Sequence, residues 1–406
     1  MKYIDGGVCA AQGFKASGLH CGIRKNKTKR DVALILSEKV GTAAAVYTTN
    51  LVKGAPILVD MENLADGKAQ AIIVNSGNAN TCNAKKEKKA MQMCKIAARQ
   101  CAVLPSNVIV ASTGVIGMPL DVTPIEKSIG QLYWDLEHSV AGSRNAAEAI
   151  MTTDTTIKEV AVEFELGGKV CRMGGIAKGS GMIHPNLATM LIFITSDIAI
   201  SSEMLQKALK ADVNKTFNMI SVDGDTSTND TVAIISNGMA GNKLINSEGE
   251  EYDVFCKALY MITSKLCKML AADGEGATKL LECIVTGGKD VKTAQTVAKS
   301  VICSSLLKAA MFGADANWGR VLCAIGYSGA DVNINKIDVA FKSAKGELPV
   351  CKNGAGIPFS EEKAKEILLE NEIDILIDLN DGASCATAWG CDLTYDYVKI
   401  NGDYRT

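Results

Sequence analysis

The chain has 406 residues, of which 47% are hydrophobic and 22% charged, as is ordinary for a globular protein. Its formal net charge of −2 gives no basis for binding nucleic acid or an anionic membrane surface. No segment reaches the roughly 20 apolar residues of a membrane span, and residues 1–18 lack the apolar core of a secretory signal. We therefore expect a cytoplasmic protein with two domains or lobes, since the chain is too long for one simple core.

In the first half of the chain, short apolar runs predict strands at 32–36, 43–47, 71–74 and 108–110. Helical spacing predicts a helix over 84–103. A second helix is expected to run from Thr123 to about residue 136. The sequence Thr123-Pro124-Ile125-Glu126 has the form of a capping box with proline at the first helical position.

In the second half, apolar runs predict strands at 190–194, 232–235, 337–341 and 373–379. Helices are expected over 203–217, 252–271 and 293–312, and after a cap at Ser360. Strands and helices mix in both halves, and helices covering large sheets are the natural packing for such a chain. The predicted fold class is therefore α/β or α+β.

Fourteen cysteines and three histidines raise the question of disulfides or a metal site. The chain has no C-x-x-C pair, and its histidines (His20, His138 and His184) lie far apart. Several cysteines lie in apolar runs, where a thiol behaves as a small hydrophobic side chain. We expect free structural thiols and no metal site.

The stretch from Lys178 to Asp197, KGSGMIHPNLATMLIFITSD, carries the strongest local signal for chemistry. A glycine-rich polar run ends at Ala188, and Thr189 then opens a run that reads as a strand buried on both faces. Cleavage before Thr189 would place a free α-amine beside its hydroxyl, which activates this weak nucleophile. The local pattern also fits an ordinary strand after a glycine loop. His184 is a weaker candidate, as a catalytic base.

Other polar clusters could complete such a site. Thr113-Gly114, after a buried strand, can direct a hydroxyl and a backbone N–H to one point as an oxyanion hole requires, although a plain turn also fits. The hydroxyl cluster at 151–155 fits a solvated turn equally well. Glu275 lies between two glycines, where a ligand can approach the backbone closely, but an acid there also fits a helix start. The polar run 223–230 lacks the spacing of an EF-hand and reads as an active-site loop or turn.

Taken together, the motifs resemble one family. They are, in chain order, NSGNANTC, STGVIG, MTTDT, AKGSGMIHPNLATML, SVDGDTSTND, DGEGATK, ADANWGR and the terminal NGDYRT. This set is similar to the bifunctional ornithine acetyltransferase/glutamate N-acetyltransferase family of the cyclic arginine pathway, and the resemblance runs from residue 7 to the end of the chain.

The resemblance implies a fold similar to that of the N-terminal-nucleophile hydrolases, with two sheets between helical layers and a smaller second lobe. It also implies self-cleavage between Ala188 and Thr189. The products would be an α chain, residues 1–188, and a β chain, residues 189–406, joined in a heterotetramer of two α and two β chains.

The same resemblance implies roles for individual residues. Thr189 would be the nucleophile, with Thr113 and Gly114 as the oxyanion hole. The residues implied to bind substrate are Thr152, Lys178, Thr189, Glu275, Asn401 and Thr406. The two residues at 401 and 402, Asn-Gly, suggest a turn that folds the tail back over the site.

The implied reaction moves the acetyl group of N2-acetylornithine to glutamate through acetyl-Thr189, with ping-pong kinetics and without a cofactor. Lys178 would hold the substrate carboxylate and Glu275 the ammonium group. Use of acetyl-CoA as a second donor is left open. The alternative enzyme is an amidohydrolase or aminopeptidase on the same type of fold, in which water removes the acyl group. A non-catalytic binding protein fits less well, because nucleophile, oxyanion donors and acid are all present.

Overall fold

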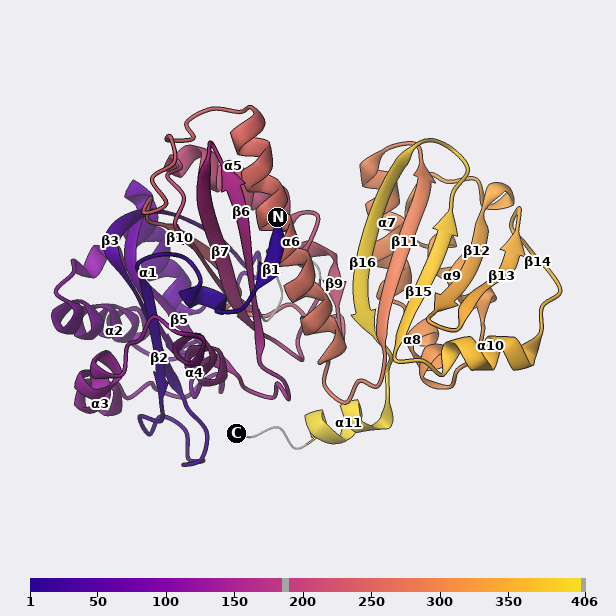
Figure 1. Ribbon diagram of the computed structural model, residues 1–406. Coiled ribbons are helices and arrows are strands. Elements are labelled where there is room, and N and C mark those ends of the chain that lie inside the picture. Colours follow the sequence, from indigo (N-terminus) through magenta and orange to yellow (C-terminus); the bar gives the residue numbers. More distant parts are fainter. Residues whose placement is uncertain (185–189, 403–406) are drawn as a thin grey trace.

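The computed structural model describes residues 1–184 and 190–402. These residues form two β-sheets, one of nine strands and one of seven, in two lobes that lie side by side (Figure 1). The predicted mixture of strands and helices, with two sheets and a smaller second lobe, is confirmed.

The larger sheet has the strand order β1-β6-β7-β8-β10-β3-β4-β5, with β2 paired to β3 outside this path. Its strands are β1 (Lys2–Ile4), β2 (Phe14–Leu19), β3 (Val32–Tyr47), β4 (Lys68–Asn75), β5 (Val108–Ser112), β6 (Lys158–Leu166), β7 (Lys169–Lys178), β8 (Leu191–Ser196) and β10 (Thr231–Ser236).

Strand β8 lies near the middle of this sheet and is buried along its whole length. It pairs antiparallel with β7 on one side and parallel with β10 on the other, and β10 pairs antiparallel with β3. Strands from before and after residue 188 are therefore interleaved in one sheet. The apolar run at 190–194 is confirmed as a strand without a solvent-exposed face.

Helices cover both faces of the larger sheet. Those of the first half are α1 (Ala55–Asn63), α2 (Lys86–Cys101), α3 (Thr123–Trp134) and α4 (Val140–Ile150), followed by α5 (Ser202–Val213) and α6 (Glu250–Ala272). Helix α4 packs against β2, β3 and β7, whereas α1 and α2 pack against β5. Helix α6 contacts β6 and β7 of the larger sheet and also β11 and β16 of the smaller one, so it lies between the lobes (Figure 1).

The smaller sheet has the order β14-β13-β12-β15-β11-β16-β9. Its strands are β9 (Ile220–Ser221), β11 (Leu280–Gly288), β12 (Asp338–Ser343), β13 (Gly346–Lys352), β14 (Ala355–Gly356), β15 (Glu372–Asp378) and β16 (Ser384–Cys391). The remaining helices are α7 (Val291–Ile302), α8 (Ser305–Phe312), α9 (Trp318–Gly326), α10 (Glu361–Leu368) and α11 (Tyr395–Gly402). Strand β15 alternates buried and half-buried residues from Ile373 on, as its sequence predicts.

Three predicted elements differ from the structure. The runs at 32–36 and 43–47 belong to the single strand β3, whose pairing with β4 shifts between Leu36 and Gly41. The helix expected over 293–312 is two helices, because Ser304 accepts a hydrogen bond from the Leu307 N–H and starts α8.

The capping box at Thr123 is the third difference. Thr123 is already the first residue of α3, and its N–H donates to the Asp121 carboxylate at 2.9 Å. Glu126, which a capping box would direct back to the backbone, instead forms an ion pair with Arg99 at 3.0 Å. The Ser360 cap is confirmed, since its hydroxyl accepts from the Lys363 N–H.

Candidate active site

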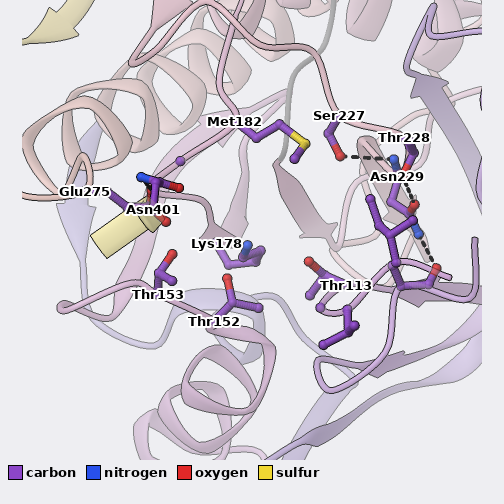
Figure 2. A pocket seen from close by; sticks show the side chains of 15 residues that line it. Thr113, Thr152, Thr153, Lys178, Met182, Ser227, Thr228, Asn229, Glu275 and Asn401 are labelled. Carbon is purple, nitrogen blue, oxygen red and sulfur yellow. Dashed lines mark hydrogen bonds between the residues drawn. The ribbon is translucent and has the colours of Figure 1, made fainter. Parts of the chain in front are cut away.

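A cavity of about 310 Å³ brings together six of the residues implied by the sequence motifs. Thr113, Gly114, Thr152, Lys178, Glu275 and Asn401 all line it, and five of these side chains are seen around it in Figure 2. Ala188, Thr189 and Thr406, the other three, lie outside the described residues. The polar loop at 223–230 also reaches the cavity, through Ser227, Thr228 and Asn229, in agreement with its interpretation as an active-site loop.

Thr113 and Gly114 follow the end of β5 and lie against the chain at Gly77. The Thr113 N–H donates to the Asn75 carbonyl at 2.9 Å, which fixes the start of this turn. Gly114 has a φ of +122°, and a Cβ there would come within 2.7 Å of the Gly77 carbonyl carbon. Only glycine fits this position. Gly114 also lines the cavity.

Asn229 holds the adjoining part of the cavity wall in place. Its side-chain amide donates to the carbonyls of Ala79 and Ser112, at 2.6 and 2.8 Å. Its side-chain oxygen accepts from the hydroxyls of Thr81 and Thr228, at 2.7 and 2.6 Å. A buried amide with all these partners ties the 227–229 loop to the residues just before Thr113.

Lys178 is the last residue of β7 and is only 2% exposed. Its ammonium nitrogen lies 4.0 Å from the Asp154 carboxylate. Burial lowers the pKa of Lys178, and the charge of Asp154 opposes this effect. Burial alone would raise the pKa of Asp154, but Lys178 and Lys158 together hold it below its ordinary value. The cavity thus has a cation supported by an ionised acid behind it.

Glu275 and Asn401 close the other side of the cavity. The Glu275 N–H donates to the Ser180 carbonyl at 2.8 Å. A Cβ at Gly181 would lie 2.3 Å from the Glu275 carboxylate, so the missing side chain at Gly181 makes room for this acid. The Asn401 amide donates to Glu275 at 2.7 Å. Asn401 and Gly402 are the last residues of α11 rather than the predicted turn, because the helix itself carries the chain to Glu275.

The residues that follow Thr189 lead directly into β8. Met190 is buried, and its N–H donates to the Asp230 carboxylate at 2.9 Å. Burial raises the pKa of Asp230 well above its ordinary value. Lys178 pairs with Leu191 across β7 and β8. The start of β8 therefore lies between two segments that line the cavity, the end of β7 and the loop before β10.

His184 points to a different environment. Its Nδ1 lies 3.4 Å from the Ser221 hydroxyl and 3.8 Å from the Cys303 thiol, and burial lowers its pKa. His184 is not among the described residues that line the cavity. The geometry gives no support to the minor hypothesis of a histidine base.

The charged residues behind the cavity were not predicted from the sequence. Asp154, Lys158 and Asp273 form a buried charged cluster that contacts the segments carrying Thr152, Lys178 and Glu275. Part of this cluster could have been found from the sequence at 151–155. There Asp154 stands four residues before Lys158, the first residue of β6. Its pairing with Asp273, 115 residues later, cannot be predicted from local sequence.

Within residues 1–184 and 190–402, no group of three His, Cys, Asp or Glu side chains is placed to hold a metal ion. All fourteen cysteines are free thiols. None of the helices in the described part of the chain has the length and apolarity needed to cross a bilayer.

Comparison with known proteins identifies the family. The ArgJ family model matches residues 15–406. The arginine biosynthesis bifunctional protein ArgJ of Caldanaerobacter subterraneus subsp. tengcongensis is 51% identical, over 100% of both chains. ArgJ 1 of Clostridium acetobutylicum is 49% identical over 97% of this chain and 96% of its own. The crystal structure of the Bacillus halodurans argJ protein superimposes with a TM-score of 0.50 at 46% identity, covering 52% of this chain and 98% of that one. The chain thus belongs to the ArgJ family of arginine-biosynthesis acyltransferases, the ornithine acetyltransferase/glutamate N-acetyltransferase family that its motifs resemble.

Proposed function

We propose that this ArgJ-family enzyme transfers the acetyl group of N2-acetylornithine to glutamate through an acetyl ester of Thr189. One observation carries the proposal. A single cavity gathers two candidate oxyanion donors, a buried lysine, an acid and an amide, from four separate segments of the chain. These are the groups needed to hold an N-acetylated amino acid that has a second, free amine.

Recognition of the substrate follows from charge. The Lys178 ammonium group would hold the carboxylate that N-acetylornithine and glutamate share. The Glu275 carboxylate would hold the side-chain ammonium of ornithine. Thr152 and Asn401 line the same cavity and can hydrogen-bond the substrate, and Thr406 is proposed to join them.

The chemistry has two halves. The Thr189 hydroxyl attacks the acetyl carbonyl, and the free α-amine of Thr189 takes the hydroxyl proton. Thr113 and Gly114 stabilise the oxyanion that forms. The amide C–N bond then breaks and ornithine leaves with the proton. In the second half, the amine of glutamate attacks the acetyl ester, and the Thr189 hydroxyl is restored. No metal or organic cofactor takes part in this exchange.

Two features support Thr189 as the nucleophile. Met190 and Leu191, which follow it, are fixed by Asp230 and by pairing opposite Lys178. Asn229, adjacent to Asp230, lines the cavity, and so does Lys178. The chain therefore enters β8 beside two segments that line the cavity, the end of β7 and the loop before β10.

Self-cleavage before Thr189 belongs to the same proposal. It would give an α chain of residues 1–188 and a β chain of residues 189–406. Because β8 and β10 are hydrogen-bonded between β7 and β3, the two chains would remain joined by the sheet after cleavage. We further propose that two α and two β chains form a heterotetramer. The fourteen free thiols suit the reducing cytoplasm as its compartment.

The test separates transfer from hydrolysis. Purified enzyme is given N-acetylornithine with and without glutamate, and the products are identified. A transferase forms N-acetylglutamate only when glutamate is present. Release of acetate at the same rate in both mixtures would support the alternative amidohydrolase and contradict the proposal. A third mixture of acetyl-CoA and glutamate shows whether acetyl-CoA also serves as donor.

A further inference from the structure

Behind the cavity lies a buried cluster of three charged side chains, Asp154, Lys158 and Asp273. Their side chains are 0%, 0% and 5% exposed. The Lys158 ammonium donates to Asp154 at 2.7 Å and to Asp273 at 2.5 Å. With Lys178, 4.0 Å from Asp154, the group contains two acids and two lysines. The cluster is thus balanced in charge, as burial of ionised groups requires.

Asp154 joins two of the cavity's segments. One carboxylate oxygen accepts from the Thr152 N–H at 2.9 Å, and the other accepts from the Gly179 N–H at 2.7 Å. Thr152 lines the cavity, and Gly179 follows Lys178 directly. A single buried carboxylate therefore sets the distance between the loop after α4 and the end of β7.

Asp273 joins the third segment. It accepts from the Thr155 N–H at 3.0 Å and lies two residues before Glu275. The Glu275 segment is also tied to the end of β7, through the bond from its N–H to the Ser180 carbonyl at 2.8 Å. Lys158 thus connects Asp154, which lies beside Lys178, with Asp273, which lies two residues before Glu275.

We propose that Asp154 and Lys158 are positioning residues that hold Lys178 and Glu275 at the spacing set by the substrate's carboxylate and ammonium groups. The inference rests on the proposed function, in which these two ends of N-acetylornithine are recognised separately. Neither positioning residue is among those lining the cavity in the described part of the chain. Their influence would pass through Lys178, Thr152 and the 273–275 segment.

The cluster also bears on the charge of Lys178. Burial lowers the pKa of this lysine, Asp154 raises it, Lys158 and Arg24 lower it further, and Glu275 raises it. The charge of Lys178 in turn lowers the pKa of Asp230, against the larger opposite effect of burial. Replacing Asp154 with asparagine removes the strongest support for the charged form. Lys178 would then lose its proton at a lower pH, and binding of the substrate carboxylate would weaken from that pH upward.

The experiment compares Asp154→Asn with wild type and with Asp212→Asn, which removes a buried acid of α5 outside the cavity. KM and kcat for N-acetylornithine are measured across pH, using fully self-cleaved protein. We expect Asp154→Asn to raise KM roughly 10- to 100-fold, the size of one lost charged hydrogen bond. Its KM should also begin to rise at a lower pH than in wild type. Asp212→Asn should show neither change.

A second variant separates spacing from charge and also serves if Asp154→Asn does not fold. The double substitution Lys158→Met/Asp273→Asn removes one charge of each sign and leaves Asp154 beside Lys178. It should raise KM without the shift to lower pH expected of Asp154→Asn, because Asp154 stays in place and the loss of Lys158 removes a charge that lowers the pKa of Lys178. The single substitution Lys158→Arg keeps the positive charge and the hydrogen-bond donors. It should therefore retain most of the wild-type affinity for N-acetylornithine.

The outcomes distinguish failure of the proposed function from failure of the positioning role alone. A wild-type enzyme that forms no N-acetylglutamate overturns the proposed function and this inference with it. A wild-type enzyme that transfers acetyl normally, together with unchanged KM in Asp154→Asn or in the double variant, overturns the inference alone. A raised KM with a shifted pH dependence in Asp154→Asn supports it.

Discussion

The side-chain amide of Asn401 donates a hydrogen bond of 2.7 Å to the carboxylate of Glu275, 126 residues earlier in the chain. This bond ties the last turn of α11 to the loop after α6, at the edge of the cavity. Two further bonds hold the same helix in place. The Tyr397 hydroxyl donates to Asp223 at 3.2 Å, and the Thr394 hydroxyl donates to the Gly276 carbonyl at 2.7 Å. The C-terminal segment is therefore part of the candidate active site.

Removal of the tail should impair substrate binding without unfolding the protein. Helix α11 has no buried residues, so loss of its last two residues exposes little apolar surface. We expect a folded, self-cleaved enzyme with poor affinity for N-acetylornithine. It should release a larger share of its product as acetate, because water reaches the acetyl ester more easily. Affinity and product ratio are measured beside Lys399→Ala, a change on the same helix that leaves Asn401 in place. Wild-type values in the truncated enzyme would remove the tail from the site.

Loss of the Thr113 hydroxyl should slow turnover more than it weakens binding. An oxyanion donor acts mainly on the tetrahedral intermediate, so Thr113→Ala should lose roughly 100- to 1000-fold in kcat with little change in KM. Thr113→Ser keeps a hydroxyl at this position and serves as the matched control. Steady-state kinetics of both variants provide the check. A near-normal kcat with a raised KM would assign Thr113 to substrate binding instead.

Thr189→Ala should abolish both self-cleavage and transfer, because the hydroxyl that begins each reaction is absent. Wild-type protein is expected to run as two fragments, residues 1–188 and 189–406, and the variant as one intact chain. Thr189→Ser retains a hydroxyl and should still be cleaved. N-terminal sequencing of both fragments identifies the new N-terminus. Active enzyme without a chain that starts Thr-Met-Leu-Ile would contradict self-cleavage at this position.

Stability should depend on pH through Asp212 in α5. Burial raises its pKa from 3.8 to about 6, partly opposed by hydrogen bonds from Thr263 and Thr216. The folded protein therefore holds this proton more strongly than the unfolded chain does. The resulting stabilisation is full below pH 3.8 and is lost as pH rises to about 6. Asp212→Asn should flatten the pH dependence of Tm over this range, whereas Asp5→Asn, an exposed change, should not. Parallel Tm curves for Asp212→Asn and wild type would contradict this assignment.

Much of the fold could be predicted because local pattern and tertiary environment agree. The apolar run of β8 and the alternation of β15 match their buried and half-buried positions in the two sheets. The break between α7 and α8 was missed because Ser304 lies within an otherwise continuous helical pattern, and only its cap to Leu307 reveals it. The bulged course of β3 depends on its pairing with β4, which local sequence does not specify.

The sequence motifs predicted which residues belong to the site but not how these residues are arranged in space. Lys178 and Glu275 were identified because their motifs resemble a known family, and the structure brings both to one cavity. The bond from Asn401 to Glu275 and the link from Lys158 to Asp273 span long stretches of chain. Such contacts depend on the order of strands in the sheets and on the placement of α6. They could be found only once the chain was seen folded.

The proposed function requires Thr189 to carry the acetyl group between the two substrates. The most direct measurement supplies enzyme with N-acetylornithine labelled in its acetyl group, without glutamate, followed by rapid acid quenching and peptide mass spectrometry. We predict one labelled acetyl group on the peptide that begins at Thr189, released as N-acetylglutamate when glutamate is added before quenching. An unlabelled Thr189 peptide in enzyme that makes labelled N-acetylglutamate would show that the acetyl group does not pass through Thr189.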